Sequence, residues 1–131
     1  MAHGKSEVTL KGDIINVKLS GTFNKEGILR YCEHVKSLVI SLKGRPFAML
    51  VDDIEVEGGT PEAHEELQAY NLWLSQQRIV AKAIVIDNVV TQAIIAQRTP
   101  ELAQQNTRYF NHIEEASDWL VNSLNRVRQS T

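Results

Sequence analysis

Two apolar runs decide the fold of this chain: FAMLV (residues 47–51) and VAKAIVI (residues 80–86). Neither run alternates apolar with polar residues, as a strand with one face in solvent would. Near-continuous apolar strands are typical of parallel sheets, in which helices cover both faces. The two runs therefore predict neighbouring parallel strands within an α/β domain.

The segment before the first run predicts a hairpin and a helix. Residues 8–11 and 15–19 alternate apolar and polar side chains on either side of a Gly12-Asp13 turn, which predicts two antiparallel strands, the second ending at Gly21. Helical spacing then predicts a helix, capped by Asn24, whose apolar face holds Ile28, Leu29, Cys32, Val35, Val39 and Leu42.

Three more helices and one short strand are predicted after the first run. A loop over residues 52–59 leads to a helix that begins at Thr60-Pro61, with threonine as N-cap and proline in the first turn. The third helix restarts at Thr99-Pro100, and the fourth follows a strand at 108–110. The apolar face of the third helix is predicted from Val89, Val90, Ala93, Ile94 and Gln97. The fourth helix is predicted to be capped by Asn111, with Glu114 as its capping-box partner. Its inward face is predicted to hold Ala116, Leu120, Ser123, Leu124 and Val127.

The predicted order is β-β-α-β-α-β-α-β-α, which implies a mostly parallel sheet flanked by helices. The length of 131 residues suits one domain, and we expect residues 1–6 to be flexible.

Composition excludes several classes of protein. The net charge of -2 argues against nucleic-acid binding, which uses a basic surface. No apolar run approaches the roughly 20 residues of a membrane span, and the start of the chain lacks the apolar core of a signal peptide. One cysteine, Cys32, permits no internal disulfide. Together these features favour a cytoplasmic location.

Three features resemble one known family. They are the order of the elements, the buried strand ending in aspartate (FAMLVDD), and the C-terminal pattern RYFNHIEEASDWL, which includes Phe110, Glu114 and Trp119. Over residues 7–125 the chain is similar to the SpoIIAA-like superfamily, the group that contains STAS domains. The resemblance implies a cytoplasmic, non-enzymatic module that acts through protein contacts.

The resemblance does not extend to the phosphorylation switch of the family. Members of the anti-sigma-antagonist type carry a phosphorylatable serine after the third strand, in an Asp-x-Ser setting. Here Asp52 is followed by Asp53 and Ile54, and Thr60 is the only nearby hydroxyl. The switch is therefore not inferred for this chain. The same fold also serves lipid-transfer relatives with an apolar pocket, an analogy at the level of the fold.

The stretch VDDIEVEGGTPEAHEEL (residues 51–67) has the layout of a phosphate site, with glycines before a helix start. Its charge opposes that function. Two unit charges 4 Å apart in water interact by about 1 kcal/mol, so several acids outweigh a helix-end term of roughly 0.3–1 kcal/mol. Hard cations suit the charge better, but no calcium-loop spacing occurs. The favoured interpretation is a solvated helix start. The acids are Asp52, Asp53, Glu55, Glu57, Glu62, Glu65 and Glu66.

If a ligand binds, the carboxyl edge of the sheet is the place we expect it. The candidate ligand-binding residues at that edge are Asp52, Asp53, Thr60, His64, Asp87 and Asn88. The favoured alternative for Asp87 and Asn88 is that one of them caps the third helix.

No metal ligand set, cofactor motif or catalytic residue is predicted. The sequence HEEL at residues 64–67 lacks the second histidine of HExxH, because position 68 is Gln68. Cys32 lies on an apolar helix face, where a thiol is usually inert. Common nucleotide-binding and hydrolase motifs do not occur.

The segment AYNLWL (residues 69–74) is more apolar than one buried helix face requires. Leu72, Trp73 and Leu74 are therefore candidate interface residues for a homodimer or another protein, since aromatic side chains are enriched at interfaces. Packing at the edge of the core is the alternative.

Three functions remain open from the sequence. The first is a non-enzymatic module that contacts a protein partner or a second copy. The second is a carrier with an apolar cavity near the second and third helices, which would hold a small molecule or lipid. The third is an enzyme that uses Asp52, Asp53 and Asp87 with a divalent cation.

Overall fold

A five-stranded sheet forms the centre of the protein in a computed structural model that describes residues 1–129. The strands lie in sequence order: β1 (Lys5–Lys11), β2 (Ile14–Phe23), β3 (Phe47–Gly59), β4 (Ile79–Val85) and β5 (Thr107–Phe110). The helices are α1 (Lys25–Ser41), α2 (Pro61–Ser75), α3 (Val89–Arg98), the short 3₁₀ helix η1 (Pro100–Gln105) and α4 (Ile113–Gln129). β1 runs antiparallel to β2, and every other pair is parallel. The predicted α/β order is confirmed, with η1 as the restart after α3.

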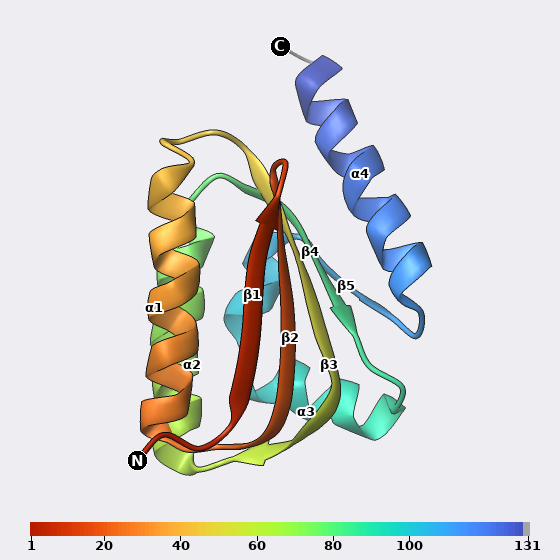
Figure 1. Ribbon diagram of the computed structural model, residues 1–131. Coiled ribbons are helices and arrows are strands. Elements are labelled where there is room, and N and C mark those ends of the chain that lie inside the picture. Colours follow the sequence, from red (N-terminus) through yellow and green to blue (C-terminus); the bar gives the residue numbers. More distant parts are fainter. Residues whose placement is uncertain (130–131) are drawn as a thin grey trace.

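Helices cover both faces of the sheet. Figure 1 shows α1 and α2 side by side on one face and α4 on the other. Parallel strands joined in sequence order by right-handed crossovers place their connecting helices on a single face, which leaves the opposite face to α4. A large apolar cluster lies beneath α1 and α2, and a smaller one, with Ala48, Ala83 and Leu120 at its centre, lies beneath α4.

The two apolar runs pair as predicted. Met49 lies opposite Lys82 and Val51 opposite Ile84 in the parallel register of β3 and β4. Alternate side chains serve the two apolar clusters: Met49 and Val51 face α1 and α2, while Leu50 packs under α4. Both faces are therefore buried, which is why neither run alternates.

β3 does not end where the sequence predicted. The expected loop over residues 52–59 is wrong, because β3 continues to Gly59, and β2 likewise passes Gly21 to reach Phe23. The two extensions pair with each other, with Thr22 opposite Gly58, across two shifts of register. Backbone hydrogen bonds between neighbouring strands thus hold a polar segment in strand geometry, which periodicity cannot reveal.

Three of the predicted helix caps are confirmed and one is not. The side chains of Asn24, Thr60 and Asn88 accept hydrogen bonds from the first turns of α1, α2 and α3. α4 begins at Ile113, later than a cap at Asn111 requires. Asn24 also binds the start of the chain: its Oδ1 accepts from the His3 backbone N–H, and its Nδ2 donates to the Met1 carbonyl. Flexibility of residues 1–6 stays a prediction.

A buried lysine ties α2 and η1 to the sheet. Lys82 points from β4 into the core, where its ammonium donates to Asn71 Oδ1 at 2.9 Å and to Gln105 Oε1 at 3.0 Å. Gln105 in turn donates to the Asn71 carbonyl at 2.8 Å. Burial lowers the pKa of Lys82 to about 7. Paired acceptors let a cationic side chain lie where an unpaired one would be costly.

We expect Lys82→Met to remove a pH-dependent part of the stability. Between about pH 7 and about pH 10 the unfolded chain retains a lysine proton that the folded chain has released, so the free energy of unfolding of the wild type rises with pH. Relative to Lys82→Met, the wild type should gain about 1–3 kcal/mol over that range. Urea denaturation at several pH values measures the difference, with the exposed Lys11→Met as the control for loss of one positive charge. If the free energies of unfolding of the wild type and Lys82→Met change with pH in parallel, the expectation is contradicted.

Candidate functional site

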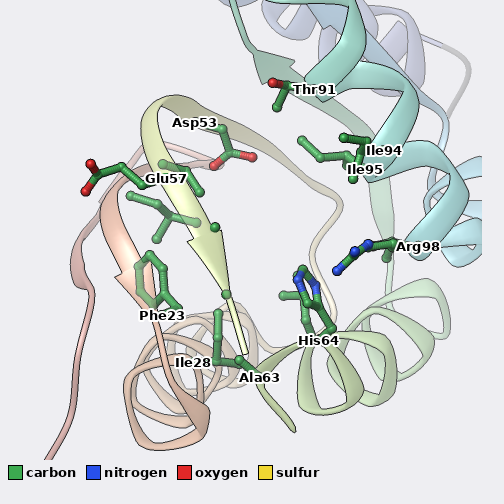
Figure 2. A pocket seen from close by; sticks show the side chains of 16 residues that line it. Phe23, Ile28, Asp53, Glu57, Ala63, His64, Thr91, Ile94, Ile95 and Arg98 are labelled. Carbon is green, nitrogen blue, oxygen red and sulfur yellow. The ribbon is translucent and has the colours of Figure 1, made fainter. Parts of the chain in front are cut away.

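A cavity of about 400 Å³ lies at the carboxyl end of β3, between the first turns of α2 and one side of α3. Figure 2 shows the side chains that surround it. Most of its wall is apolar, and the apolar residues are Leu19, Phe23, Ile28, Val56, Ala63, Leu67, Ile94 and Ile95. The polar side chains are Asp53, Glu57, His64, Thr91, Arg98 and Thr99. An apolar concavity with a few polar groups is the usual form of a small-molecule site.

Asp53 enters the cavity because of its place on β3. It follows Met49 and Val51 at strand spacing, so it faces the same side of the sheet as they do. Its Oδ1 is buried and has no hydrogen-bond partner among residues 1–129. Burial raises the pKa of Asp53 to about 7, an increase that the charge of Lys82 opposes and that of Asp52 assists. A buried carboxyl without a partner costs stability, and a suitable ligand could supply that partner.

A positive group borders the cavity on the side away from Asp53. Figure 2 shows Arg98, from the end of α3, directed toward His64 in the first turns of α2. Partial burial lowers the pKa of His64, and the positive charge of Arg98 lowers it further. Arg98 has no acidic partner within ion-pair distance in the described part of the chain. Its guanidinium is therefore available to an anionic group.

The predicted ligand-binding residues divide into two sets. Asp53 and His64 line the cavity. Thr60 accepts a hydrogen bond from the Ala63 N–H at 3.1 Å, and Asn88 accepts from Val90 and Thr91, so both act as helix caps.

The two other predicted residues lie apart from the cavity wall. Asp52 Oδ1 accepts from the Ile54 N–H at 3.2 Å, and Asp87 is exposed. Among residues 1–129 no group of three or more His, Cys, Asp or Glu side chains is placed to hold a metal ion. Asp52, Asp53 and Asp87, the set of the enzyme hypothesis, therefore do not meet at one point.

Apart from Asp53, the acidic residues of the stretch are spread along β3 and the start of α2, and two of them pair with lysines. Glu55 pairs with Lys18 at 2.8 Å, and Glu66 lies 3.8 Å from Lys25. These lysines come from β2 and α1, so cations missing from the stretch itself are supplied by neighbouring elements.

The candidate interface residues lie in three different environments. Leu72 is 50% exposed, whereas Leu74 is fully buried in the core. Trp73 packs against the core with one side, and the ammonium of Lys36 lies 5.3 Å from its ring centroid. Of the three, Leu72 presents the most surface to a partner.

The predicted apolar face of α3 is wrong. Val89 and Val90 are 80% and 67% exposed, and α3 has no buried residue. The side that borders the cavity instead holds Thr91, Ile94, Ile95 and Arg98. Ile94 belongs to both sets. The prediction assumed that α3 packs flat on the sheet. Instead α3 contacts η1 and borders the cavity, so a different side of the helix turns inward.

Sequence reasoning missed Arg98 and Lys82. Arg98 could have been found from the spacing of Thr91, Ile94 and Arg98, which places them on one side of a helix. Lys82 had a clearer signal: a lysine inside a strand otherwise apolar on both faces must be paired.

Cys32 is buried as expected, and burial raises the pKa of its thiol to about 12, so it carries no reactive thiolate. No helix within residues 1–129 is long and apolar enough to span a membrane.

Comparison with known proteins agrees with this architecture. The model of one protein family, SpoIIAA-like, matches residues 14–121. A crystal structure of an uncharacterized protein with a SpoIIAA-like fold from Shewanella loihica PV-4 is similar, with a TM-score of 0.70 and 17% identity over 92% of this chain and 95% of that one. An anti-sigma factor antagonist from Mycobacterium paratuberculosis has a TM-score of 0.64 and 14% identity over 91% and 95% of the two chains. At these identities the likeness is one of fold. No curated protein matches the chain.

We expect Asp53→Asn to stabilise the protein near neutral pH. Between about pH 4 and about pH 7 the unfolded wild type has released the Asp53 proton that the folded protein retains, so its stability falls as the pH rises. The amide does not titrate, and the variant should be more stable by about 1–3 kcal/mol at pH 7, with the gap closing toward pH 4. Thermal and urea unfolding at both pH values measure the gap. The control is Asp87→Asn, the same substitution at an exposed aspartate, which should show no such difference in stability. A difference for Asp53→Asn that does not change with pH would contradict a raised pKa for the buried Asp53 carboxyl.

Proposed function

We propose that this chain, which belongs to the SpoIIAA-like family, is a non-catalytic cytoplasmic module that binds a small, mainly apolar molecule in the cavity between β3, α2 and α3. The cavity volume of about 400 Å³ lies within the usual range for ligand pockets, roughly 300–1,000 Å³. This is the second of the three functions left open from the sequence, a carrier with an apolar cavity near the second and third helices.

The observation that carries the proposal is the unpaired Oδ1 of Asp53 in a mainly apolar wall. A buried polar atom without a partner destabilises the protein unless a ligand or another group satisfies it. Natural sequences keep such atoms mainly where they serve a function. Asp53 is therefore better explained as a binding residue than as part of the core.

The non-catalytic part of the proposal rests on how the reactive groups are placed. The Cys32 thiol is buried with a raised pKa, and Lys82 is committed to Asn71 and Gln105. Asp53 and His64 remain as polar groups that orient a bound molecule. The cytoplasmic location is proposed because the single cysteine, Cys32, leaves the chain without an internal disulfide.

Blocking the cavity provides the first test. Leu67 lines the cavity from α2, and Leu67→Trp should fill part of it, whereas Leu72→Trp places the same side chain on the exposed side of that helix. We expect native mass spectrometry to find a small molecule bound to gently purified wild type and Leu72→Trp. Binding of the apolar dye anilinonaphthalene sulfonate should weaken about tenfold in Leu67→Trp, which corresponds to about 1.4 kcal/mol.

Circular dichroism verifies that each variant is folded. If Leu67→Trp does not fold, Ile95→Trp blocks the cavity from α3, which contributes no buried residue. A folded, blocked variant that binds the dye as tightly as wild type would overturn the proposal.

Protein contact is the second candidate function. Its support is the exposed apolar surface, with Leu72 at 50% on α2 and Val89 at 80% on α3, and the fold shared with an anti-sigma factor antagonist. Leu72 and the outer side of Trp73 would meet a second copy or another protein, while Leu74 supports them from the core.

We expect a homodimer, if this second function holds, to be lost in Leu72→Glu. A buried carboxylate without a partner is costly at an interface. Light scattering across a range of concentrations measures the mass, and Val121→Glu on α4, where Val121 is 43% exposed, is the control. A strict monomer at every concentration would exclude the dimer.

A further inference from the structure

The polar groups of the cavity are unevenly distributed. The guanidinium of Arg98 and the imidazole of His64 lie on the side of α2 and α3, while Asp53 lies on the β3 side (Figure 2). Apolar side chains such as Leu67 and Ile95 line the space with them. A molecule that fills this space must be apolar in the middle and polar at two separate points.

Arg98 and His64 favour an anionic end group. A guanidinium presents several N–H donors in a fork that fits a carboxylate with two parallel hydrogen bonds. Arg98 has no ion-pair partner within residues 1–129, and the contact with Gln68 Nε2, at 2.6 Å, is made by its main-chain carbonyl and not by its guanidinium. The positive charge of the Arg98 guanidinium is therefore not balanced by an acidic side chain of the described residues.

A single negative charge suits the surroundings better than a phosphate. Glu57 also lines the cavity, and the first turns of α2 carry Glu62 and Glu65. A second negative charge on the ligand would be repelled by these acids at close range. Among biological anions with an apolar body, carboxylates meet this requirement.

Asp53 favours a neutral hydrogen-bond donor at the other end. Its Oδ1 has no partner, and while the carboxyl is ionised this oxygen can only accept a hydrogen bond, so an acceptor on the ligand would gain nothing from the charged form. Burial disfavours the charged carboxylate and raises its pKa to about 7, which makes an ammonium partner less suitable than a hydroxyl. A hydroxyl can donate to the charged carboxylate and can both donate to and accept from the neutral acid.

We propose, on the basis of the proposed function, that the cavity selects apolar carboxylic acids that carry a hydroxyl group at the far end. Arg98 and His64 bind the carboxylate, the apolar wall covers the chain or ring between, and Asp53 accepts the hydrogen bond of the hydroxyl. The three parts of the site come from α3, α2 and β3, so the selectivity depends on the folded arrangement.

Calorimetric titration with three matched series tests this selectivity: unbranched ω-hydroxy acids, plain acids and primary alcohols, each from hexyl to dodecyl. For wild type we expect the hydroxy acid to bind about tenfold more tightly than the plain acid of the same chain length, and the alcohol to bind most weakly. Arg98→Gln should weaken the acids about tenfold and leave the alcohols unchanged. Arg126→Gln, the same change of charge on α4 across the sheet, should alter none of the three series.

Asp53→Leu supplies a readout that a purely structural role would not give. It replaces the carboxyl with an apolar group of similar size, so plain acids should then bind more tightly than hydroxy acids, a reversal of the wild-type order. Equal affinity of acids and alcohols for wild type, or an unchanged order in Asp53→Leu, would overturn the selectivity while the dye and mass-spectrometric results still uphold ligand binding. Failure of every series to bind would also overturn it, and a cavity that binds neither these compounds nor the dye would remove the proposed function as well.

Discussion

The covered face of the two central strands imposes the constraint on which the rest of this structure depends. Side chains that leave β3 and β4 toward α1 and α2 enter the core, where a polar group needs a partner. Two ionisable residues occupy this face. Lys82 finds its partners in Asn71 and Gln105, while Asp53, further along β3, finds none for its Oδ1. The same constraint therefore produces a structural lysine in one place and a candidate binding residue in the other.

The cavity exists because α3 does not cover the sheet as α1 and α2 do. Its Ile94 and Ile95 face the open space at the end of β3, and the helix has no buried residue. The extension of β3 to Gly59 brings Val56 and Glu57 past the layer of helices and forms the opposite wall. A strand longer than its apolar run, together with a helix that stands off from the sheet, leaves room for a ligand where a packed core would otherwise close.

Membership of the SpoIIAA-like family explains the architecture more fully than the function. Function resides in a site, and the same fold can carry different sites. In this chain the position where related proteins were expected to carry a phosphorylatable serine is occupied by Ile54, and the neighbouring Asp53 turns into the cavity. A carboxyl at the wall of an apolar space suits the ligand recognition that we propose.

Much of the fold could be predicted from the sequence because its signals are local. The apolar runs FAMLV and VAKAIVI, the caps Asn24 and Thr60, and the break at Pro100 each state a backbone preference within a few residues, and together they determined the order of strands and helices. Asp53 and His64, two of the residues predicted for the carboxyl edge of the sheet, line the cavity, and their binding of a ligand stays a prediction. The length of β3, the side of α3 that turns inward and the partners of Lys82 were decided only by the tertiary structure. The physical reason is that each depends on hydrogen bonds, packing or charges from a segment distant in sequence, and no pattern within one segment contains that information.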